Sequence, residues 1–243
     1  MMPLPKISTP YYNLELPSTG QEVEYRPFLV KEEKVLLLAL ESEDTKQITS
    51  AIKTVIKNCV KTKGIKVESL PTFDIEYLFL NIRGKSVGEE VDVNIICPDD
   101  GTTQVPTKIN IDEIEVKKSD DHNNKIKVDD QLMIEMKYPS LDQFIKNNFD
   151  FAGASTKDTM DQSFTLIASC IDKIYNEEEV WECGDVTKKE MTEFLEQMNS
   201  TQFKSIEEFF NTMPKLSHTL TVKNPNTKVE SEVVLEGLSS FFA

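Results

Sequence analysis

Alternating apolar and polar residues near the start of the chain predict a β-hairpin. Every second residue is apolar in the stretches 12–16 and 23–25, and the residues 17–20 between them read Pro-Ser-Thr-Gly. A period of two is typical of a half-buried strand, and Pro and Gly favour the turn that joins two strands. We therefore expect an N-terminal hairpin within residues 1–30.

The pattern then changes to helical spacing. Apolar residues recur every three or four positions in 31–40, 45–63 and 74–83, which is typical of helices that pack one face on a core. Asp74 has a side chain that can cap a helix, and Gly84 is a residue at which helices end. The third helix is therefore predicted to begin at Asp74 and to end before Gly84.

A period of two returns in the middle of the chain. Apolar residues alternate on either side of the turn Cys97-Pro98-Asp99-Asp100-Gly101, and a second alternating pair follows. The polar stretch 117–124 is expected to be an exposed loop, with His122 in contact with solvent. The predicted strands are 91–95, 105–111, 125–128 and 132–136.

The second half of the chain is predicted to be helical before it ends in strands. Three of its helices open on capping-box sequences, at Ser140, Thr187 and Ser205. The expected helices are 140–148, 157–175, 187–198 and 205–212, and the expected strands are 219–222 and 229–235.

Both halves share an order of helix, strand, Pro-containing turn and strand. The turns contain Cys97-Pro98 and Asn224-Pro225, and we interpret the shared order as a pseudo-repeat. Two facing strand–turn–strand knuckles are the layout of a zinc ribbon, in which each knuckle supplies two metal ligands. The predicted fold class is therefore α+β, with helical segments and small antiparallel hairpins, two of which form a zinc-ribbon-like pair.

The metal ligands of such a ribbon are largely missing. At the ligand positions the chain has Cys97 and Asp100 in the first turn and Asn224 and Thr227 in the second. One thiolate, one carboxylate and two neutral groups make a poor tetrahedral zinc site. Two readings stay open: ordinary polar turns, or a degenerate ribbon held together without metal. The segments that we distinguish are 1–30, 31–116 with the first knuckle, 117–139, and 140–243 with the second knuckle.

Composition narrows the classes of function. The chain has 243 residues and a net charge of −15, which opposes binding to nucleic acid or to anionic lipid. No apolar run is long enough to span a membrane, and no signal peptide is expected. The four cysteines form no Cys-x-x-Cys pair, and we expect free thiols in a reducing cytoplasm.

Catalytic signatures are missing from the sequence. His122 and His218, the only histidines, have no Ser or Cys partner at motif spacing, and nucleotide-binding and nucleophile-elbow motifs are absent. Acidic pairs such as Asp129-Asp130 lack the spacing of a calcium loop. We expect neither an enzyme nor a cofactor.

Two segments carry a resemblance to a known family. Residues 25–34, Tyr-Arg-Pro-Phe-Leu-Val-Lys-Glu-Glu-Lys, and residues 73–80, Phe-Asp-Ile-Glu-Tyr-Leu-Phe-Leu, resemble the small baseplate hub assembly proteins of T-even-type bacteriophages. The resemblance returns at Leu235 to Leu238. It implies a chaperone or minor subunit of the central baseplate hub, which contacts other hub and tail proteins in the host cytoplasm and in some cases stays in the virion.

Five residues are candidates for partner binding. Arg26 and Phe28 lie in the first family segment, Trp181 lies among acidic residues, and Phe241 and Phe242 lie in the apolar tail. Arg26, Trp181 and the tail each have a structural alternative: Arg26 ties the hairpin to the first helix, Trp181 belongs to the core, and the tail packs under the ribbon. The alternative function is a degenerate zinc-ribbon regulator associated with nucleic acid, which the net charge opposes.

Overall fold

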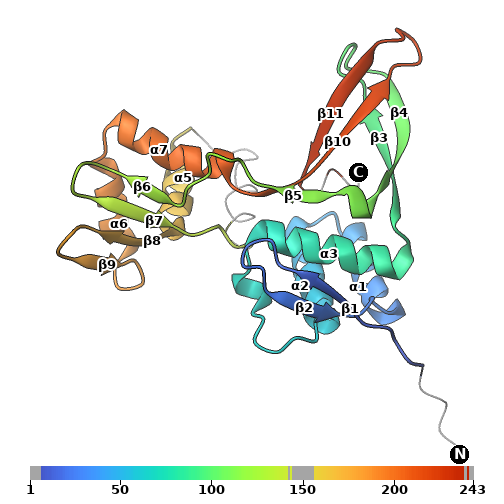
Figure 1. Cartoon of the computed structure of the whole chain (residues 1–243), viewed down its shortest axis with the longest axis horizontal. Coiled ribbons are helices and arrows are strands. Elements are labelled where there is room, and N and C mark those ends of the chain that lie inside the picture. The colour runs from blue at the N-terminus through green and yellow to red at the C-terminus, as the bar shows by residue number, and fades with distance from the viewer. Residues whose placement is uncertain (1–6, 142, 144–155, 238–239, 241–243) are drawn as a thin grey trace, which may run out of the picture. The chain divides into compact units, whose positions relative to one another are not determined.

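The chain folds into two compact units that each combine helices with antiparallel sheets (Figure 1). The computed structural model describes residues 7–141, 143, 156–237 and 240. Unit 1 comprises residues 1–67, 73–117 and 215–243, and unit 2 comprises residues 68–72 and 118–214. The α+β class predicted from the sequence is confirmed.

Unit 1 contains three helices, the N-terminal hairpin and two longer hairpins. In the N-terminal hairpin Tyr12 lies opposite Tyr25, as the alternation predicts. The helices are α1 (Val30–Glu41), α2 (Thr45–Cys59) and α3 (Thr72–Val87), with short 3-10 turns at Val67–Ser69 and Ile111–Glu113. The strands are β1 (Tyr12–Glu15), β2 (Glu22–Tyr25), β3 (Glu90–Ile96), β4 (Gln104–Asn110), β5 (Glu115–Lys117), β10 (Lys215–Lys223) and β11 (Glu230–Glu236).

The two longer hairpins share one apolar core. β3 pairs with β4, and β10 lies between β11 and β5 in a three-stranded antiparallel sheet. Alternate residues of β3 are buried, so one face of this hairpin is covered and the other is solvated. Residues from both hairpins and from α3 meet in this core, namely Leu80, Val91, Val93, Ile95, Ile109, Leu216 and Val222.

Helix α3 is longer at both ends than the sequence predicts. Asp74 does not cap it; its buried carboxylate accepts hydrogen bonds from the backbone N–H and the hydroxyl of Ser18. Gly84 lies inside the helix, where an added Cβ would come within 3.4 Å of Ile111. The helix ends before Gly88, which has a φ of +122°. Gly84 is thus explained by close packing, and Gly88 supplies the left-handed conformation that ends a helix.

In the described residues of unit 2, three complete helices pack on a four-stranded antiparallel sheet with the order β6-β7-β8-β9. Its core draws on both layers, with Ile134, Ile171, Ile206 and Phe209 almost fully buried. The strands are β6 (Lys125–Lys127), β7 (Met133–Met136), β8 (Ile171–Tyr175) and β9 (Val180–Glu182), and the helices are α5 (Thr156–Cys170), α6 (Lys188–Glu196) and α7 (Ser200–Thr212).

The predicted helix 157–175 is wrong in its last turn, because the chain enters β8 directly after Cys170. Ile171 and Ile174 are both buried although they are three residues apart. The register with β7 shifts between Glu135 and Met136, so that Ile171 and Ile174 both face the core. The bulge therefore gives this strand two buried residues three positions apart, which is a spacing typical of a helix.

The starts of the last two helices test the capping-box predictions. Thr187 and Glu190 form the reciprocal hydrogen bonds predicted for α6. The box predicted at Ser205 is wrong, because α7 begins at Ser200 and is capped by Asn199. Ser140 and Gln143 form the expected hydrogen bonds, but the rest of the predicted helix 140–148 lies outside the described residues.

His122 is buried rather than exposed in its loop. The residue is 9% exposed, and its imidazole lies between two hydroxyls, with Nδ1 2.9 Å from Thr212 Oγ1 and Nε2 3.0 Å from Tyr138 Oη. Its ring also stacks on Tyr138 and contacts Phe209. Aromatic packing and two hydroxyl partners hold a polar residue inside unit 2, which the surrounding polar sequence did not reveal.

We expect His122 to make the stability of unit 2 depend on pH. Burial, and to a lesser extent Lys118, lowers the pKa of His122 below 6.5, so the unfolded chain binds the proton more readily. Stability is therefore full above pH ~6.5 and falls as the pH drops below that value, by at most about 1.4 kcal/mol per pH unit. Urea unfolding followed by the fluorescence of Trp181, the single tryptophan, should show a smaller pH dependence in His122→Gln and an unchanged one in the unit 1 control His218→Gln.

Candidate functional site

The turns of the two long hairpins of unit 1 meet through side-chain hydrogen bonds. The buried Asn224 amide donates to both carboxylate oxygens of Asp99, at 3.0 and 3.1 Å, and to Asp100 Oδ2 at 2.9 Å. The Thr227 hydroxyl donates to Asp99. Asn226 adds a hydrogen bond of 3.0 Å to Thr103. We call these residues of the two turns the knuckle contact.

Each turn is also ordered by its own side chain. Asp100 Oδ1 accepts from the backbone N–H groups of Thr102 and Thr103, both at 3.0 Å. Asn224 Oδ1 accepts from the N–H groups of Asn226 and Thr227. These are Asx turns, in which a short polar side chain replaces a backbone acceptor. Asn224 therefore has a double role, as acceptor within its own turn and as donor to the other one.

The electrostatics of the knuckle contact favour carboxylates and disfavour a thiolate. Hydrogen bonds from Thr103 lower the pKa of Asp100, and those from Thr227 and Asn224 lower the pKa of Asp99. Burial and these two carboxylates raise the pKa of the Cys97 thiol. Because zinc binds the thiolate, this environment disfavours Cys97 as a zinc ligand. Among the described residues, no group of three or more His, Cys, Asp or Glu side chains is arranged to hold a metal ion.

The structure thus brings together three of the four ligand positions that the sequence singled out. Asp100, Asn224 and Thr227 belong to the knuckle contact, and Cys97 is buried in the first turn, where its backbone pairs with Thr103 and Gly101. Amide–carboxylate hydrogen bonds join the two turns, and the interpretation of the hairpins as a degenerate zinc ribbon stays a prediction.

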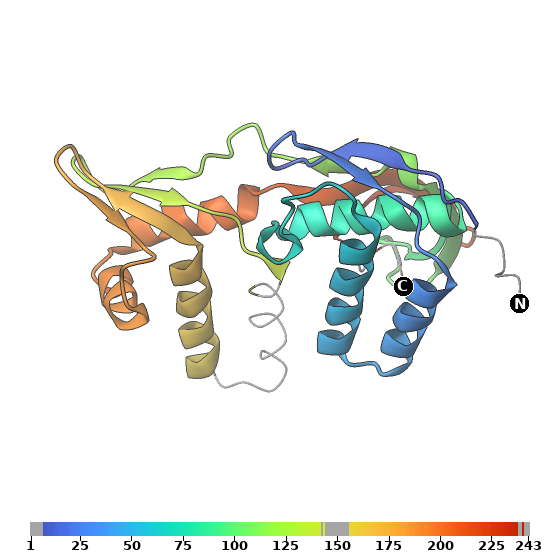
Figure 2. The ribbon, with the colours of Figure 1, turned by 90° about the horizontal axis from the view of Figure 1, so that it is seen from below.

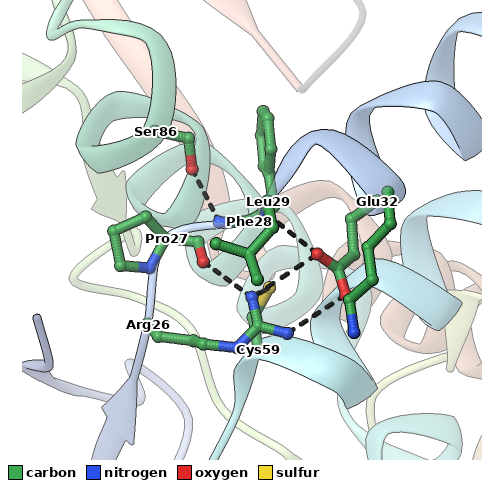
Figure 3. A network of polar contacts seen from close by, with 8 residues as sticks. Arg26, Pro27, Phe28, Leu29, Glu32, Cys59 and Ser86 are labelled. Carbon is green, nitrogen blue, oxygen red and sulfur yellow. Dashed lines mark hydrogen bonds and ion pairs between the residues drawn. The ribbon is translucent and has the colours of Figure 1, made fainter. Parts of the chain in front are cut away.

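Arg26, the first partner-binding candidate, lies in the interior of unit 1 (Figure 3). Its guanidinium forms an ion pair of 3.1 Å with Glu32 on α1. It also donates to the Pro27 carbonyl at 2.8 Å and lies 3.7 Å from the Cys59 sulfur on α2. Its own backbone N–H donates to the Cys59 carbonyl. Arg26 therefore connects the N-terminal hairpin to the first two helices.

Glu32 is the acceptor at the centre of this network. Its carboxylate accepts from Arg26 and from the backbone N–H of Leu29 at the start of α1, at 2.9 Å. Burial alone would raise the pKa of Glu32, but these hydrogen bonds lower it below its usual range. Of the two alternatives for Arg26, the geometry favours the internal tie, since only 7% of the residue is exposed.

The remaining candidates occupy different environments. Phe28 is half-buried, and its backbone N–H donates to the Ser86 hydroxyl on α3 at 2.9 Å. Trp181 is 40% exposed on β9, the edge strand of unit 2, beside Val180, which is 59% exposed. Phe241 and Phe242 lie outside the described residues. Trp181 thus has the surface access that binding a partner requires.

One exposed feature was not predicted from the sequence. Helix α1 has large apolar residues in contact with solvent, including Val30, Leu37, Leu38 and Leu40. The signal was available, because apolar residues occupy positions on every side of this short helix. Helical periodicity assigns apolar residues to a core face by default, whereas several of those on α1 face solvent.

Two hollows in the described part of the structure lie in unit 2. The larger one, of about 780 Å³, lies in unit 2 between α5, α6 and α7 and is lined by residues such as Phe164, Leu195 and Phe203. Its other lining groups are a methionine, three hydroxyls, one amide and two glutamates. The helices of the described residues are all too short or too polar to cross a lipid bilayer.

Comparison with known proteins supplies the family. The chain matches none of the curated proteins and none of the solved structures with which it was compared. The model of one family, described as T4 bacteriophage base plate protein, matches residues 9–243 and so covers both units and both hairpins of the knuckle contact. A match over nearly the entire length shows that the chain belongs to the family of T4 bacteriophage base plate proteins.

Proposed function

We propose that this baseplate protein works in building the central hub of a contractile phage tail, as a hub assembly chaperone or a minor hub subunit. The observation that carries the proposal is the family match over residues 9–243. The hub role itself rests on the resemblance of residues 25–34 and 73–80 to hub assembly proteins. The activity is binding to other baseplate hub and tail proteins, without catalysis.

Surface properties support a role in protein binding. The net charge of −15 suits a soluble partner better than DNA or anionic lipid. Trp181 and Val180 give unit 2 an exposed apolar edge, and tryptophan is enriched among residues that dominate binding energy. In unit 1 the acidic pair Asp99-Asp100 at the hairpin tips would repel phosphates. We place the protein in the host cytoplasm during assembly and at the baseplate if it remains in the virion.

Affinity purification from infected cells tests the proposal. A tagged chain is expressed during infection by the phage that encodes it, and the recovered proteins are identified by mass spectrometry. We expect baseplate hub proteins to be enriched, and recovery to fall when Trp181→Ser is used in place of the wild type. Lys204→Ser, a change on α7 of unit 2, serves as the matched control. Recovery of no tail protein would overturn the proposal.

The same material distinguishes the two forms of the proposal. Mass spectrometry of purified virions should detect a hub subunit at a fixed ratio to other baseplate proteins, whereas a chaperone should be present only in assembly intermediates. Retention of DNA by the purified chain in a low-salt filter-binding assay would instead support the nucleic-acid alternative, because salt-sensitive retention is the signature of phosphate contacts.

A further inference from the structure

Helix α1 exposes apolar side chains around most of its circumference. Its only buried residues are Glu32 and Ala39, whereas Val30 is 79% exposed and Leu37 and Leu38 are 54% and 57% exposed. A helix that is apolar on all sides is normally found inside a larger structure. Large exposed apolar patches on a folded protein mark a surface that another molecule covers.

Helix α2 shows that this exposure is specific to α1. The two helices lie side by side and run antiparallel (Figure 2, blue). The outward positions of α2 are polar, as Thr54 and Lys57 illustrate, while Val55 and Ile56 are fully buried. Since α2 separates polar and apolar faces in the usual way, the small size of unit 1 does not account for the exposed leucines of α1.

The charged residues of α1 are divided between its covered and its exposed face. Glu32 and Glu33 lie in the first turn, where acidic residues suit the helix dipole, and Glu32 is buried. Lys31, Lys34 and the last residue, Glu41, are exposed. The exposed face therefore has basic residues in its N-terminal half and an acidic residue at its C-terminal end.

A second α1 in the opposite direction is complementary to this distribution of charge. Lys34, Leu37, Leu38 and Glu41 follow the i, i+3, i+4, i+7 pattern and share the outward face. When two copies are centred between Leu37 and Leu38, unlike charges and apolar residues face each other across the pair. Lys34 of each copy then lies at the level of Glu41 of the other copy, and Leu37 and Leu38 of both copies lie at the centre of the pair.

Other arrangements of the two helices do not bring Lys34 and Glu41 together. A parallel pair places Lys34 beside Lys34 and Glu41 beside Glu41, which is repulsive. A shift of one residue in the antiparallel pair removes the contact between Lys34 and Glu41. The complementarity is therefore a property of one two-fold arrangement, as expected for an isologous interface in which the same patch serves both subunits.

We propose that α1 is a dimerisation helix that binds α1 of a second copy of this chain, antiparallel and centred between Leu37 and Leu38. The area is limited, because one face of a 12-residue helix is smaller than the roughly 800 Å² per partner of a standard interface. The dimer should therefore form in the micromolar range and weaken with salt. This inference is independent of the hub role proposed above.

Sedimentation velocity of the full chain tests the dimer. Between about 1 and about 200 µM, the wild type should shift from the 27.7 kDa protomer to twice that mass. Leu37→Glu should remain a monomer, because it places a charge at the centre of the pair. Thr54→Glu adds the same charge to the exposed face of α2 and should dimerise like the wild type. Circular dichroism checks that each variant keeps its helices.

A charge exchange tests the register. Lys34→Glu and Glu41→Lys each present like charges to a second identical copy, so each variant alone should be monomeric. Mixed in equal amounts they should form a heterodimer, since each acidic side chain then faces a basic one. Such rescue requires that positions 34 and 41 face each other, and loss of folding cannot produce it.

Three results would overturn the proposal. The first is a wild type that stays monomeric over the whole concentration range. The second is a dimer that Leu37→Glu does not weaken, which would assign self-association to another surface. The third is a monomeric wild type whose α1 binds phosphatidylglycerol vesicles or a hub protein in a Leu37-dependent way, which would assign the face to a membrane or to a different partner.

Discussion

Replacing Arg26 by Met should destabilise unit 1 by about 3–5 kcal/mol, the range measured when one partner of a buried ion pair is removed. Met keeps most of the volume of the arginine but leaves the Glu32 carboxylate, which is 2% exposed, without its main partner. Lys31 lies 3.3 Å from Glu32 but is 70% exposed, so it compensates little. Urea unfolding followed by far-ultraviolet circular dichroism measures the loss.

The two units allow an internal control. Trp181 lies in unit 2, so its fluorescence should report an unfolding transition that Arg26→Met leaves unchanged. Lys31→Met removes an exposed charge beside the same carboxylate and should change stability by less than about 1 kcal/mol. The double variant with Glu32→Gln should recover part of the loss, because no unpaired charge remains buried. A loss from Arg26→Met no larger than that from Lys31→Met would contradict the internal role of Arg26.

The hairpins and most helices could be predicted because their patterns follow burial. β3 alternates buried and exposed residues along its whole length, and α2 separates its faces cleanly. The failures have a local cause in each case. The bulge between Ile171 and Lys173 gives β8 the spacing of buried residues that is typical of a helix. The packing of Gly84 on Ile111 places a glycine inside a helix. Such features depend on a neighbouring strand or helix, which sequence periodicity does not contain.

The same distinction applies to the candidate site: positions within one turn could be predicted, and contacts between distant segments could not. Three of the positions that the turn sequences indicate, Asp100, Asn224 and Thr227, take part in the knuckle contact, whereas their derivation from metal ligands stays a prediction. Their partners could not be predicted, because Asn224 meets Asp99 across 125 residues of sequence. The exposure of α1 was missed for a related reason: apolar residues are assigned to a core by default, and the sequence alone does not say which side of a helix the rest of its own chain covers.

Asn224→Ala should destabilise unit 1 by about 2–3 kcal/mol, since hydrogen bonds to charged groups are worth about 1.5–3 kcal/mol each and water replaces part of the loss. Asn224 is fully buried, and its amide is the donor that lies between the carboxylates of Asp99 and Asp100. Without it, both carboxylates face each other across the space that the amide occupied. The loss should appear in circular dichroism, while the Trp181 transition of unit 2 stays in place.

Two further variants separate the causes of that loss. Asn226→Ala removes one exposed hydrogen bond to Thr103 and should change stability by about 1 kcal/mol or less. Asn224→Asp keeps the shape of the side chain but adds a third carboxylate, so it should be more destabilising than Asn224→Ala at neutral pH. If the turns are joined by hydrogen bonds, a chelator should leave the wild-type unfolding midpoint unchanged. Equal stabilities of Asn224→Ala and Asn226→Ala, or a midpoint that falls on chelation, would show that something other than the Asn224 amide joins the two turns.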